Sequence, residues 1–289
     1  MPGHTKTELQ ALLAAAGLAP LHRFGQNFLV DLNLMRKLVS AAKLQPEDVV
    51  LEIGCATGSL TEFLLDSGAY VIGVEIDHGL QRILQQRLGT QPRFTLVPGD
   101  ALASKNQINP LILQQLAEHS PAPGGAYKLV ANLPYQIATP LLMELLLVRP
   151  PFALLVATIQ REVGLRLGAQ PATAEYGPIS VITATLAELH PLAILPRTAF
   201  WPQPRVESAM LAIQPRAPTD LEPADIPAFV DFVRASFRNR RKKLVNTLSG
   251  RKPSEAREVF EQLGINPDAR AETLSPAQWR SLFAALLAS

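Results

Sequence analysis

The chain contains a single cysteine, Cys55, among its 289 residues. One cysteine excludes an internal disulfide and any metal site built from several cysteines. Aromatic residues make up only 6% of the chain, and no apolar run approaches the roughly 18 residues that a membrane-spanning helix needs. The stretch 141–148, one of the longest, already contains Glu144. We therefore expect no membrane segment, and the cysteine content is typical of a protein of the reducing cytoplasm.

Charge is also nearly balanced. Lysine and arginine number 27, and aspartate and glutamate number 25, which gives a net charge of +2. The distribution along the chain is more informative than the sum. Residues 1–215 carry 15 basic and 16 acidic side chains, a net −1, whereas residues 216–289 carry 12 and 9, a net +3. The densest basic patch lies in this tail, at Arg238 and in the run 240–243.

Neither a targeting segment nor a metal site is indicated. The alanine- and leucine-rich start of the chain superficially resembles a signal peptide. Thr7 and Gln10 fit a capping box and Gly17 ends the run, so we expect a short amphipathic helix instead. Histidine, a common metal ligand, occurs without the short spacing of a metal site, and no metal is expected. The histidines considered are His22, His78, His119 and His190.

Short apolar runs alternate with longer segments that have the hydrophobic spacing of helices. This alternation is typical of βαβ units, in which helices cover both faces of a parallel sheet. The predicted fold class is therefore α/β. The predicted strands are residues 49–53, 70–74, 94–97, 129–131 and 153–159.

The alternation stops after residue 159. Residues 189–195 and 209–213 are predicted strands joined by the proline-rich segment 196–204, which has no room for a crossover helix. We therefore expect an antiparallel hairpin at one edge of the sheet. A proline- and acid-rich linker follows, and beyond it apolar residues recur at helical spacing. The predicted organisation is one domain over residues 1–215 and a small all-helical domain over residues 216–289.

Glycines and carboxylates follow three consecutive predicted strands. Gly54 and Gly58 form a turn that lets the backbone approach a nucleotide-like cofactor. Glu75 closes the next strand, where a carboxylate can accept hydrogen bonds from both hydroxyls of a ribose. Asp100 follows the third strand, at a position suited to an adenine amine of the cofactor. The glycine spacing differs from the G-x-G-x-x-G fingerprint, which argues against a nicotinamide-dependent dehydrogenase.

The tetrad Asn132-Leu133-Pro134-Tyr135 directly follows a predicted strand, at the carboxyl edge of the sheet where ligands bind. The lone pair of an adenine N6 amine is delocalised into the ring, so this nitrogen is a poor nucleophile. Acceptance of its two hydrogens by the Asn132 side chain and the Leu133 carbonyl would localise electron density and direct it at a sulfonium methyl group. Pro134 would stiffen the turn, and Tyr135 would offer a face on which an extruded base stacks. Proximity and orientation would carry most of the rate, without a strong base.

Taken in order, these elements resemble the ribosomal RNA adenine N6,N6-dimethyltransferase family, from about residue 20 to the end of the chain. The similarity is strongest to its KsgA (RsmA) branch, which dimethylates two adjacent adenines near the 3′ end of small-subunit (16S) ribosomal RNA. Besides the turn, the two carboxylates and the tetrad, the motifs that carry the resemblance are residues 23–29, 160–163, 176–177, 200–208 and 237–242.

The resemblance implies a Rossmann-like class I methyltransferase with a mostly parallel seven-stranded sheet and S-adenosylmethionine as cofactor. It implies a cytoplasmic enzyme of ribosome biogenesis, expected to be a monomer, that acts on small-subunit ribosomal RNA or immature small subunits. Gln26 and Phe28 belong to an amino-terminal loop that closes over cofactor and target base in such enzymes. The residues that match cofactor contacts of the family are Asn27, Leu29, Gly54, Glu75, Asp100 and Asn132.

Binding of RNA is expected from the basic tail, where arginine and lysine would neutralise phosphates along a groove. One arginine of the first domain would contribute as well. The predicted RNA-binding residues are Arg161, Arg238, Arg240, Arg241 and Lys242.

Three residues depart from the family pattern. Cys55, Ala56 and Gln136 stand where the family usually has proline, glycine and asparagine. Alanine disfavours a positive φ, so Ala56 is expected to alter cofactor affinity without abolishing activity. Two alternatives stay open. One is an Erm-like large-subunit ribosomal RNA adenine methyltransferase, which shares the cofactor motifs. The other is a ribosome-assembly factor with reduced catalysis, against which the intact carboxylates and tetrad argue.

Overall fold

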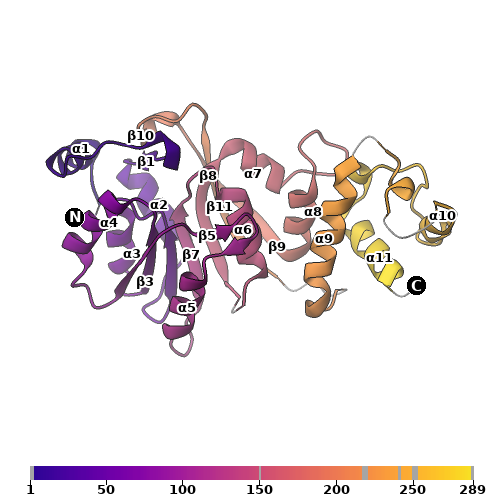
Figure 1. Ribbon diagram of the computed structural model, residues 1–289, viewed down its shortest axis with the longest axis horizontal. Helices are drawn as coiled ribbons and strands as arrows, with labels where there is room; N and C mark the ends of the chain where they lie inside the picture. The colour runs from indigo at the N-terminus through magenta and orange to yellow at the C-terminus, as the bar shows by residue number, and fades with distance from the viewer. Residues whose placement is uncertain (1–2, 150, 217–220, 240–241, 249–252, 288–289) are drawn as a thin grey trace. The chain divides into compact units, whose positions relative to one another are not determined.

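The computed structural model describes residues 3–149, 151–216, 221–239, 242–248 and 253–287. The chain forms two compact units (Figure 1). The first comprises Met1–Val163 and His190–Gln214, and the second comprises Gly164–Leu189 and Pro215–Ser289. The sequence-based division at residue 215 assigns residues 164–189 to the first part. In the structure they group with the C-terminal residues, because helix α8 (Pro178–Leu186) packs against helices α9 and α11.

The first unit is built on a seven-stranded sheet with strand order β4-β3-β2-β7-β8-β11-β9. The parallel strands are β2 (Val49–Ile53), β3 (Tyr70–Glu75), β4 (Phe94–Pro98), β7 (Tyr127–Asn132) and β8 (Leu154–Gln160). Strand β11 (Ser208–Pro215) is antiparallel to β8, and β9 (Ala187–Leu195) is its neighbour at the edge. The predicted α/β fold, with a mostly parallel sheet and an antiparallel edge, is confirmed.

Helices link the parallel strands, as crossover connections require. They are α3 (Ser59–Leu65), α4 (His78–Leu88), α5 (Pro110–Glu118) and α6 (Ala138–Leu147), while α2 (Leu32–Ala41) precedes β2. The central strands are buried on both faces, which explains their continuous apolar runs. Val50, Val71, Val130 and Val156 sit in one core cluster with Leu38 of α2.

Two short pairings complete the first unit. β1 (Phe28–Leu29) pairs antiparallel with β10 (Phe200–Trp201), and the rings of Phe28 and Trp201 stack with centroids 6.2 Å apart. Figure 1 shows this pair beside the carboxyl ends of the sheet strands. β5 (Leu102–Ser104) and β6 (Gln107–Ile108) form a small hairpin, and the short 3-10 helices η1 (His22–Phe24) and η2 (Arg197–Ala199) precede β1 and β10.

The expected amino-terminal helix is present as α1 (Lys6–Ala15). Its capping box is formed by Thr5 and Glu8, so the predicted cap at Thr7 is wrong by two residues. Thr5 has an extended backbone and its hydroxyl accepts from the Glu8 N–H, whereas Thr7 lies inside the helix. Leu9 and Leu13 bury the apolar face of α1 in a cluster that includes Phe28.

The second unit contains α7 (Arg161–Leu167) from Gly164 onward, α8, α9 (Ile226–Ser236), α10 (Pro253–Gln262), α11 (Pro276–Leu287) and the 3-10 helices η3 (Pro223–Asp225), η4 (Phe237–Asn239), η5 (Leu244–Asn246) and η6 (Ala271–Thr273). Aromatic rings fill much of its core: Trp279 is fully buried and stacks on Phe237 with centroids 5.5 Å apart. In the described parts of the chain, no helix is long and apolar enough to cross a membrane.

Candidate active site

A cavity of about 320 Å³ opens where β2, β3, β4 and β7 end, a volume within the range of about 300–1,000 Å³ that is typical of small-molecule sites. Parallel strands end at the same edge, so polar groups that are distant in sequence converge there. All the predicted catalytic and cofactor-binding residues line it: Asn27, Leu29, Gly54, Glu75, Asp100, Asn132, Leu133, Pro134 and Tyr135. Across the described ranges, no group of three or more His, Cys, Asp or Glu side chains is placed to hold a metal ion.

The turn after β2 needs glycine at two positions. Gly54 and Gly58 have φ of 77° and 85°, in the left-handed region that side chains disfavour. The Gly54 N–H donates to the Val74 carbonyl at 2.8 Å, which ties the turn to β3. A Cβ atom added at Gly54 would lie 3.4 Å from Cγ of Pro134. The cofactor turn and the tetrad therefore approach each other closely at this glycine.

Glu75 is almost completely buried at the end of β3, with 4% of its surface exposed. One carboxylate oxygen accepts the Ala56 N–H at 2.8 Å and the other accepts the Asp77 N–H at 2.9 Å. Burial raises the pKa of Glu75, and the two backbone hydrogen bonds oppose that shift. Each oxygen has a second lone pair, so the carboxylate has the capacity to accept two hydroxyls of a sugar.

Asp100 is exposed and follows β4, the neighbour of β3. The Gly99 N–H donates to the Glu75 carbonyl at 2.8 Å, which places the two carboxylates on adjacent strand ends. The Asp100 side chain accepts the Leu102 N–H at 3.0 Å, and Asn109 donates to the Asp100 carbonyl at 2.8 Å. These bonds fix the loop that presents Asp100 to the cavity.

The amino-terminal loop is tied down on two sides. The Gln26 side chain accepts the Leu21 N–H at 2.7 Å and donates to Asp77 at 3.0 Å. Asp77 is also the N-cap of α4. On the other side, the Asn27 carbonyl accepts from Asn132 Nδ2 at 3.0 Å, across 105 positions of sequence. The loop therefore bridges the tetrad and the start of α4.

The tetrad is held by buried hydroxyl groups that the sequence analysis did not identify. Thr158 donates its hydroxyl to Oδ1 of Asn132, and its carbonyl accepts the Leu133 N–H at 3.1 Å. The Tyr135 hydroxyl lies 2.6 Å from the hydroxyl of Ser208, which is fully buried. Burial raises the pKa of Tyr135, so its phenol stays neutral at physiological pH. Both supporting residues lie on strands next to or beyond β7, which local sequence patterns do not reveal.

A buried acid lies beneath the turn. Glu52 of β2 is 1% exposed and lines the cavity. Burial raises its pKa to about 8, and hydrogen bonds from Thr61 and Cys55 oppose the shift. The Thr61 hydroxyl donates to the Glu52 side chain at 2.6 Å, and the Cys55 thiol donates to its carbonyl at 3.6 Å. At neutral pH this carboxyl group is mainly protonated.

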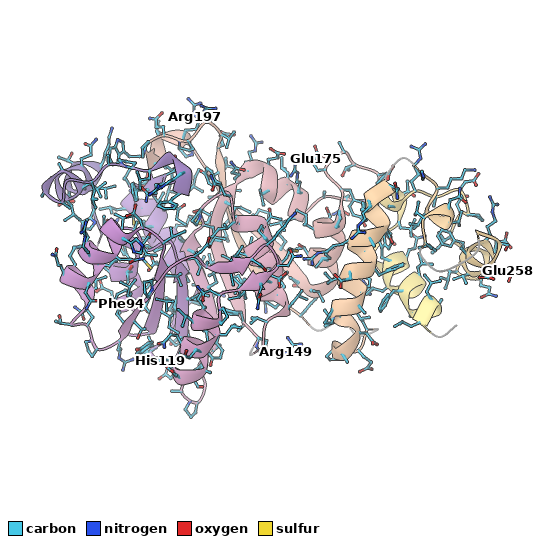
Figure 2. All side chains as sticks on the ribbon, in the orientation of Figure 1. Phe94, His119, Arg149, Glu175, Arg197 and Glu258 are labelled. Atoms are coloured by element: carbon cyan, nitrogen blue, oxygen red, sulfur yellow. The ribbon has the colours of Figure 1, made fainter. Side chains whose placement is uncertain are left out.

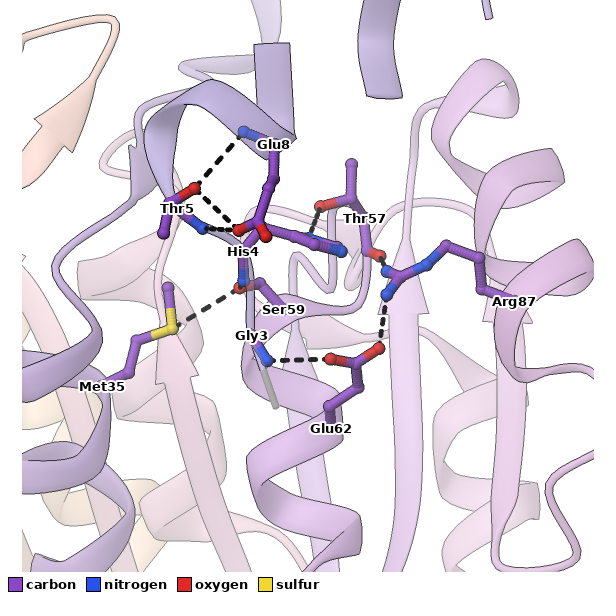
Figure 3. A network of polar contacts seen from close by, with 9 residues as sticks. All are labelled: Gly3, His4, Thr5, Glu8, Met35, Thr57, Ser59, Glu62 and Arg87. Atoms are coloured by element: carbon purple, nitrogen blue, oxygen red, sulfur yellow. Dashed lines mark hydrogen bonds and ion pairs between the residues drawn. The ribbon is translucent and has the colours of Figure 1, made fainter. Parts of the chain in front are cut away.

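His4, which precedes α1, also lines the cavity. Figure 3 shows the polar contacts around this residue. The His4 N–H donates to the Ser59 hydroxyl at 2.7 Å, and its Nδ1 lies 3.2 Å from the Thr57 hydroxyl. Arg87 contacts the Thr57 carbonyl and pairs with Glu62. Burial lowers the pKa of His4, and Arg87 lowers it further. No periodicity relates a residue before α1 to a turn more than fifty positions later, so sequence reasoning missed His4.

The predicted RNA-binding residues are divided between the two units. Arg161 lies in the first unit and pairs with Glu207 at 2.7 Å in an exposed ion pair, a kind that contributes little to stability. Arg197, labelled in Figure 2, is a further arginine of that unit and donates to the Arg205 carbonyl at 3.3 Å. Arg238 and Lys242 are exposed in the second unit. Arg240 and Arg241 lie outside the described residues.

The described residues around the basic run lie in short turns beyond the end of a helix. Helix α9 ends at Ser236, Arg238 lies in the 3-10 helix η4, and the Lys242 N–H closes a turn on the Asn239 carbonyl at 2.9 Å.

Comparison with known proteins decides the family. The model of the ribosomal RNA adenine dimethylase family matches residues 21–287. The chain belongs to this family. Ribosomal RNA small subunit methyltransferase A of Pelotomaculum thermopropionicum is 39% identical over 280 residues, which cover 95% of this chain and 94% of that protein. The protein of the same name from Moorella thermoacetica is also 39% identical, over 97% and 96% of the two chains.

Solved structures agree with the fold. A dimethyladenosine transferase from Plasmodium falciparum superposes with a TM-score of 0.70 at 22% identity, over 89% of this chain and 96% of that one, and supports the fold alone. The 23S ribosomal RNA methyltransferase ErmE superposes with a TM-score of 0.63 at 25% identity, over 90% and 99%. The resemblance derived from the motifs is thus confirmed, and the chain is a Rossmann-like methyltransferase of the adenine dimethylase family.

Proposed function

We propose that this chain transfers methyl groups from S-adenosylmethionine to the N6 amines of two adjacent adenosines near the 3′ end of small-subunit ribosomal RNA. The observation that carries the proposal is that the Asn132 amide, Glu75 and Asp100 line one cavity, at the carboxyl ends of β7, β3 and β4. The proteins named small subunit methyltransferase A, at up to 39% identity, favour the small-subunit substrate.

The residues present fit S-adenosylmethionine. Glu75 presents a buried carboxylate whose oxygens can accept two ribose hydroxyls, and Asp100 can accept the amine of the cofactor adenine. Gly54 has no Cβ and borders Pro134, which leaves backbone close to the cofactor and the target base. Asn27 and Leu29 of the amino-terminal loop also line the cavity. When bound, the cofactor supplies an electrophilic methyl group on a sulfonium.

The tetrad would hold the target adenine. Asn132 Oδ1 and the Leu133 carbonyl accept the two N6 hydrogens, which concentrates the nitrogen lone pair toward the methyl donor. Tyr135 offers its ring to the extruded base, with its hydroxyl anchored on Ser208. The methylated ammonium is acidic and loses its proton readily, so the residues need only orient the amine.

The RNA side of the proposal rests on charge. Arg238 and Lys242 are exposed and Arg161 is half exposed, so all three can reach phosphates of a ribosomal substrate. Arg240 and Arg241 belong to the same basic run of sequence. The proposal includes action on immature small subunits, as a monomer in the cytoplasm.

The test uses small subunits that lack the modification, incubated with the chain and radiolabelled S-adenosylmethionine. We expect label in two adjacent adenines of the small-subunit RNA, located by primer extension, and a loss of about 100-fold or more for Asn132→Ala. Equal labelling by Asn132→Ala would remove the assigned mechanism. Label in large-subunit RNA instead would favour the Erm-like alternative. No cofactor binding by calorimetry would favour an assembly factor without catalysis.

A further inference from the structure

Thr158 lies beside the Asn132 amide on the neighbouring strand. The two residues are register partners in the parallel pair of β7 and β8. The Thr158 hydroxyl donates to Asn132 Oδ1, and the Thr158 carbonyl accepts the Leu133 N–H at 3.1 Å. The Thr158 side chain has no exposed surface. One buried residue therefore contacts both members of the tetrad that are assigned to the target amine.

The other end of the same amide is also held. Asn132 Nδ2 donates to the Asn27 carbonyl at 3.0 Å. A backbone carbonyl can only accept, so this contact turns Nδ2 toward the amino-terminal loop and Oδ1 toward Thr158. The hydroxyl of Thr158 must then be the donor. Asn27 decides which way the amide faces, and Thr158 decides where its oxygen lies.

We propose that Thr158 is a positioning residue for methyl transfer, whose hydroxyl holds Oδ1 of Asn132 in place to accept a hydrogen of the target N6 amine. This inference rests on the function proposed above. An amide oxygen has two lone pairs, of which Thr158 occupies one, and the second remains for the adenine. Loss of the hydroxyl leaves Oδ1 held from one end of the amide only, and a small misplacement of an orienting group lowers the rate steeply.

Substitution of Thr158 by valine tests the hydroxyl at nearly constant shape. We expect Thr158→Val to lower kcat by about tenfold, the factor that corresponds to one hydrogen bond of about 1.4 kcal/mol. Thr158→Ser keeps the hydroxyl and should stay within about twofold of wild type. Cofactor affinity should change by less than about twofold, since Glu75 and Asp100 are untouched. A lower kcat with unchanged cofactor binding separates positioning from a general loss of the fold.

Thr183→Val is the matched control. Thr183 is a threonine of α8 with 1% exposure, and its hydroxyl has no hydrogen-bond partner among the described residues. The control makes the same chemical change at an equally buried position outside the cavity, so kcat should stay at the wild-type value. Thermal unfolding of both valine variants shows whether either substitution destabilises the fold.

The decisive measurement combines Thr158→Val with Asn132→Ala under single-turnover conditions. If Thr158 acts through Asn132, the double variant is no slower than Asn132→Ala alone. A further tenfold loss in the double variant overturns the inference, as does a serine variant as slow as the valine variant. Wild-type kcat in Thr158→Val also overturns it, and leaves the proposed function intact because the wild-type enzyme is active in the same assay.

Discussion

The Ala56 amide donates to Glu75 at 2.8 Å, so a residue in the left-handed conformation, with φ of 55°, holds the carboxylate at the end of β3. The backbone of the turn after β2 and the acceptor for a ribose are thereby one hydrogen-bonded unit. Alanine disfavours a positive φ, and Ala56 adopts one. Any change in the turn is transmitted to Glu75.

Ala56→Gly should relieve backbone strain in that unit. A left-handed alanine costs about 1 kcal/mol, and the greater freedom of glycine in the unfolded chain offsets about 0.4–1 kcal/mol of the gain. We expect the free energy of unfolding to rise by less than about 1 kcal/mol and the Kd for S-adenosylmethionine to fall. Urea unfolding measures the free energy of unfolding, and calorimetry measures the Kd. Ala56→Val, which strains the turn further, should move both quantities the other way, and a weaker-binding glycine variant would contradict this reading.

Glu75→Gln should weaken cofactor binding. The amide keeps one acceptor oxygen, so either the Ala56 or the Asp77 N–H meets an NH2 group and remains unpaired in a buried site. We expect Kd for S-adenosylmethionine to rise by about tenfold or more, measured by calorimetry. Glu258→Gln removes the same charge from an exposed position on α10 and should leave Kd unchanged (Figure 2).

Glu52 makes stability depend on pH. Its folded-state pKa is raised to about 8 from 4.5, so between these values the folded chain binds more protons than the unfolded chain. Glu52 therefore makes its full contribution to the free energy of unfolding below pH 4.5. This contribution is lost as the pH rises through about 8. Glu52→Gln mimics the neutral acid and should flatten this decline in urea unfolding between about pH 5 and pH 9. A decline as steep as in the wild type would assign the dependence to other groups.

His4 has the opposite dependence. Burial lowers its folded-state pKa below 6.5, so the unfolded chain binds the proton more readily and stability is lost as the pH falls below 6.5. His4→Gln should reduce that acid-side loss in thermal unfolding while keeping a side-chain partner for Thr57. His4→Ala should also raise the cofactor Kd, because it removes a side chain of the cavity wall. Lys6 is exposed on α1, and Lys6→Ala is the control. It should change neither the acid-side loss of stability nor the cofactor Kd.

Arg238 and Lys242 should act through phosphate contacts. Replacement of either by alanine is expected to weaken binding of ribosomal RNA and to reduce the slope of log K against log salt by about 1. Filter binding at several salt concentrations gives the slope. Lys6→Ala should leave the slope unchanged. An unchanged slope in both tail variants would place the RNA elsewhere on the chain.

The local sequence determined the sheet and most of the cavity. Strand β2 has the predicted bounds, Val49–Ile53, because a buried parallel strand has a mainly apolar sequence, here interrupted only by Glu52, and this one stops at Gly54. Glu75, Asp100 and Asn132 could be predicted since each lies at or just beyond the end of a strand, and parallel strands end at one edge. Periodicity and turn chemistry are local properties, so they can be read without a structure.

Only the tertiary structure decided which groups support those residues. Thr158 meets Asn132 through the register of β7 and β8, and His4 meets Thr57 through the path of the chain before α1. Residues 164–189 group with the C-terminal helices although their sequence follows the first unit without a break. Each of these depends on contacts between segments far apart in the chain, whose pairing is selected by the packing of the whole unit rather than by the propensity of either segment.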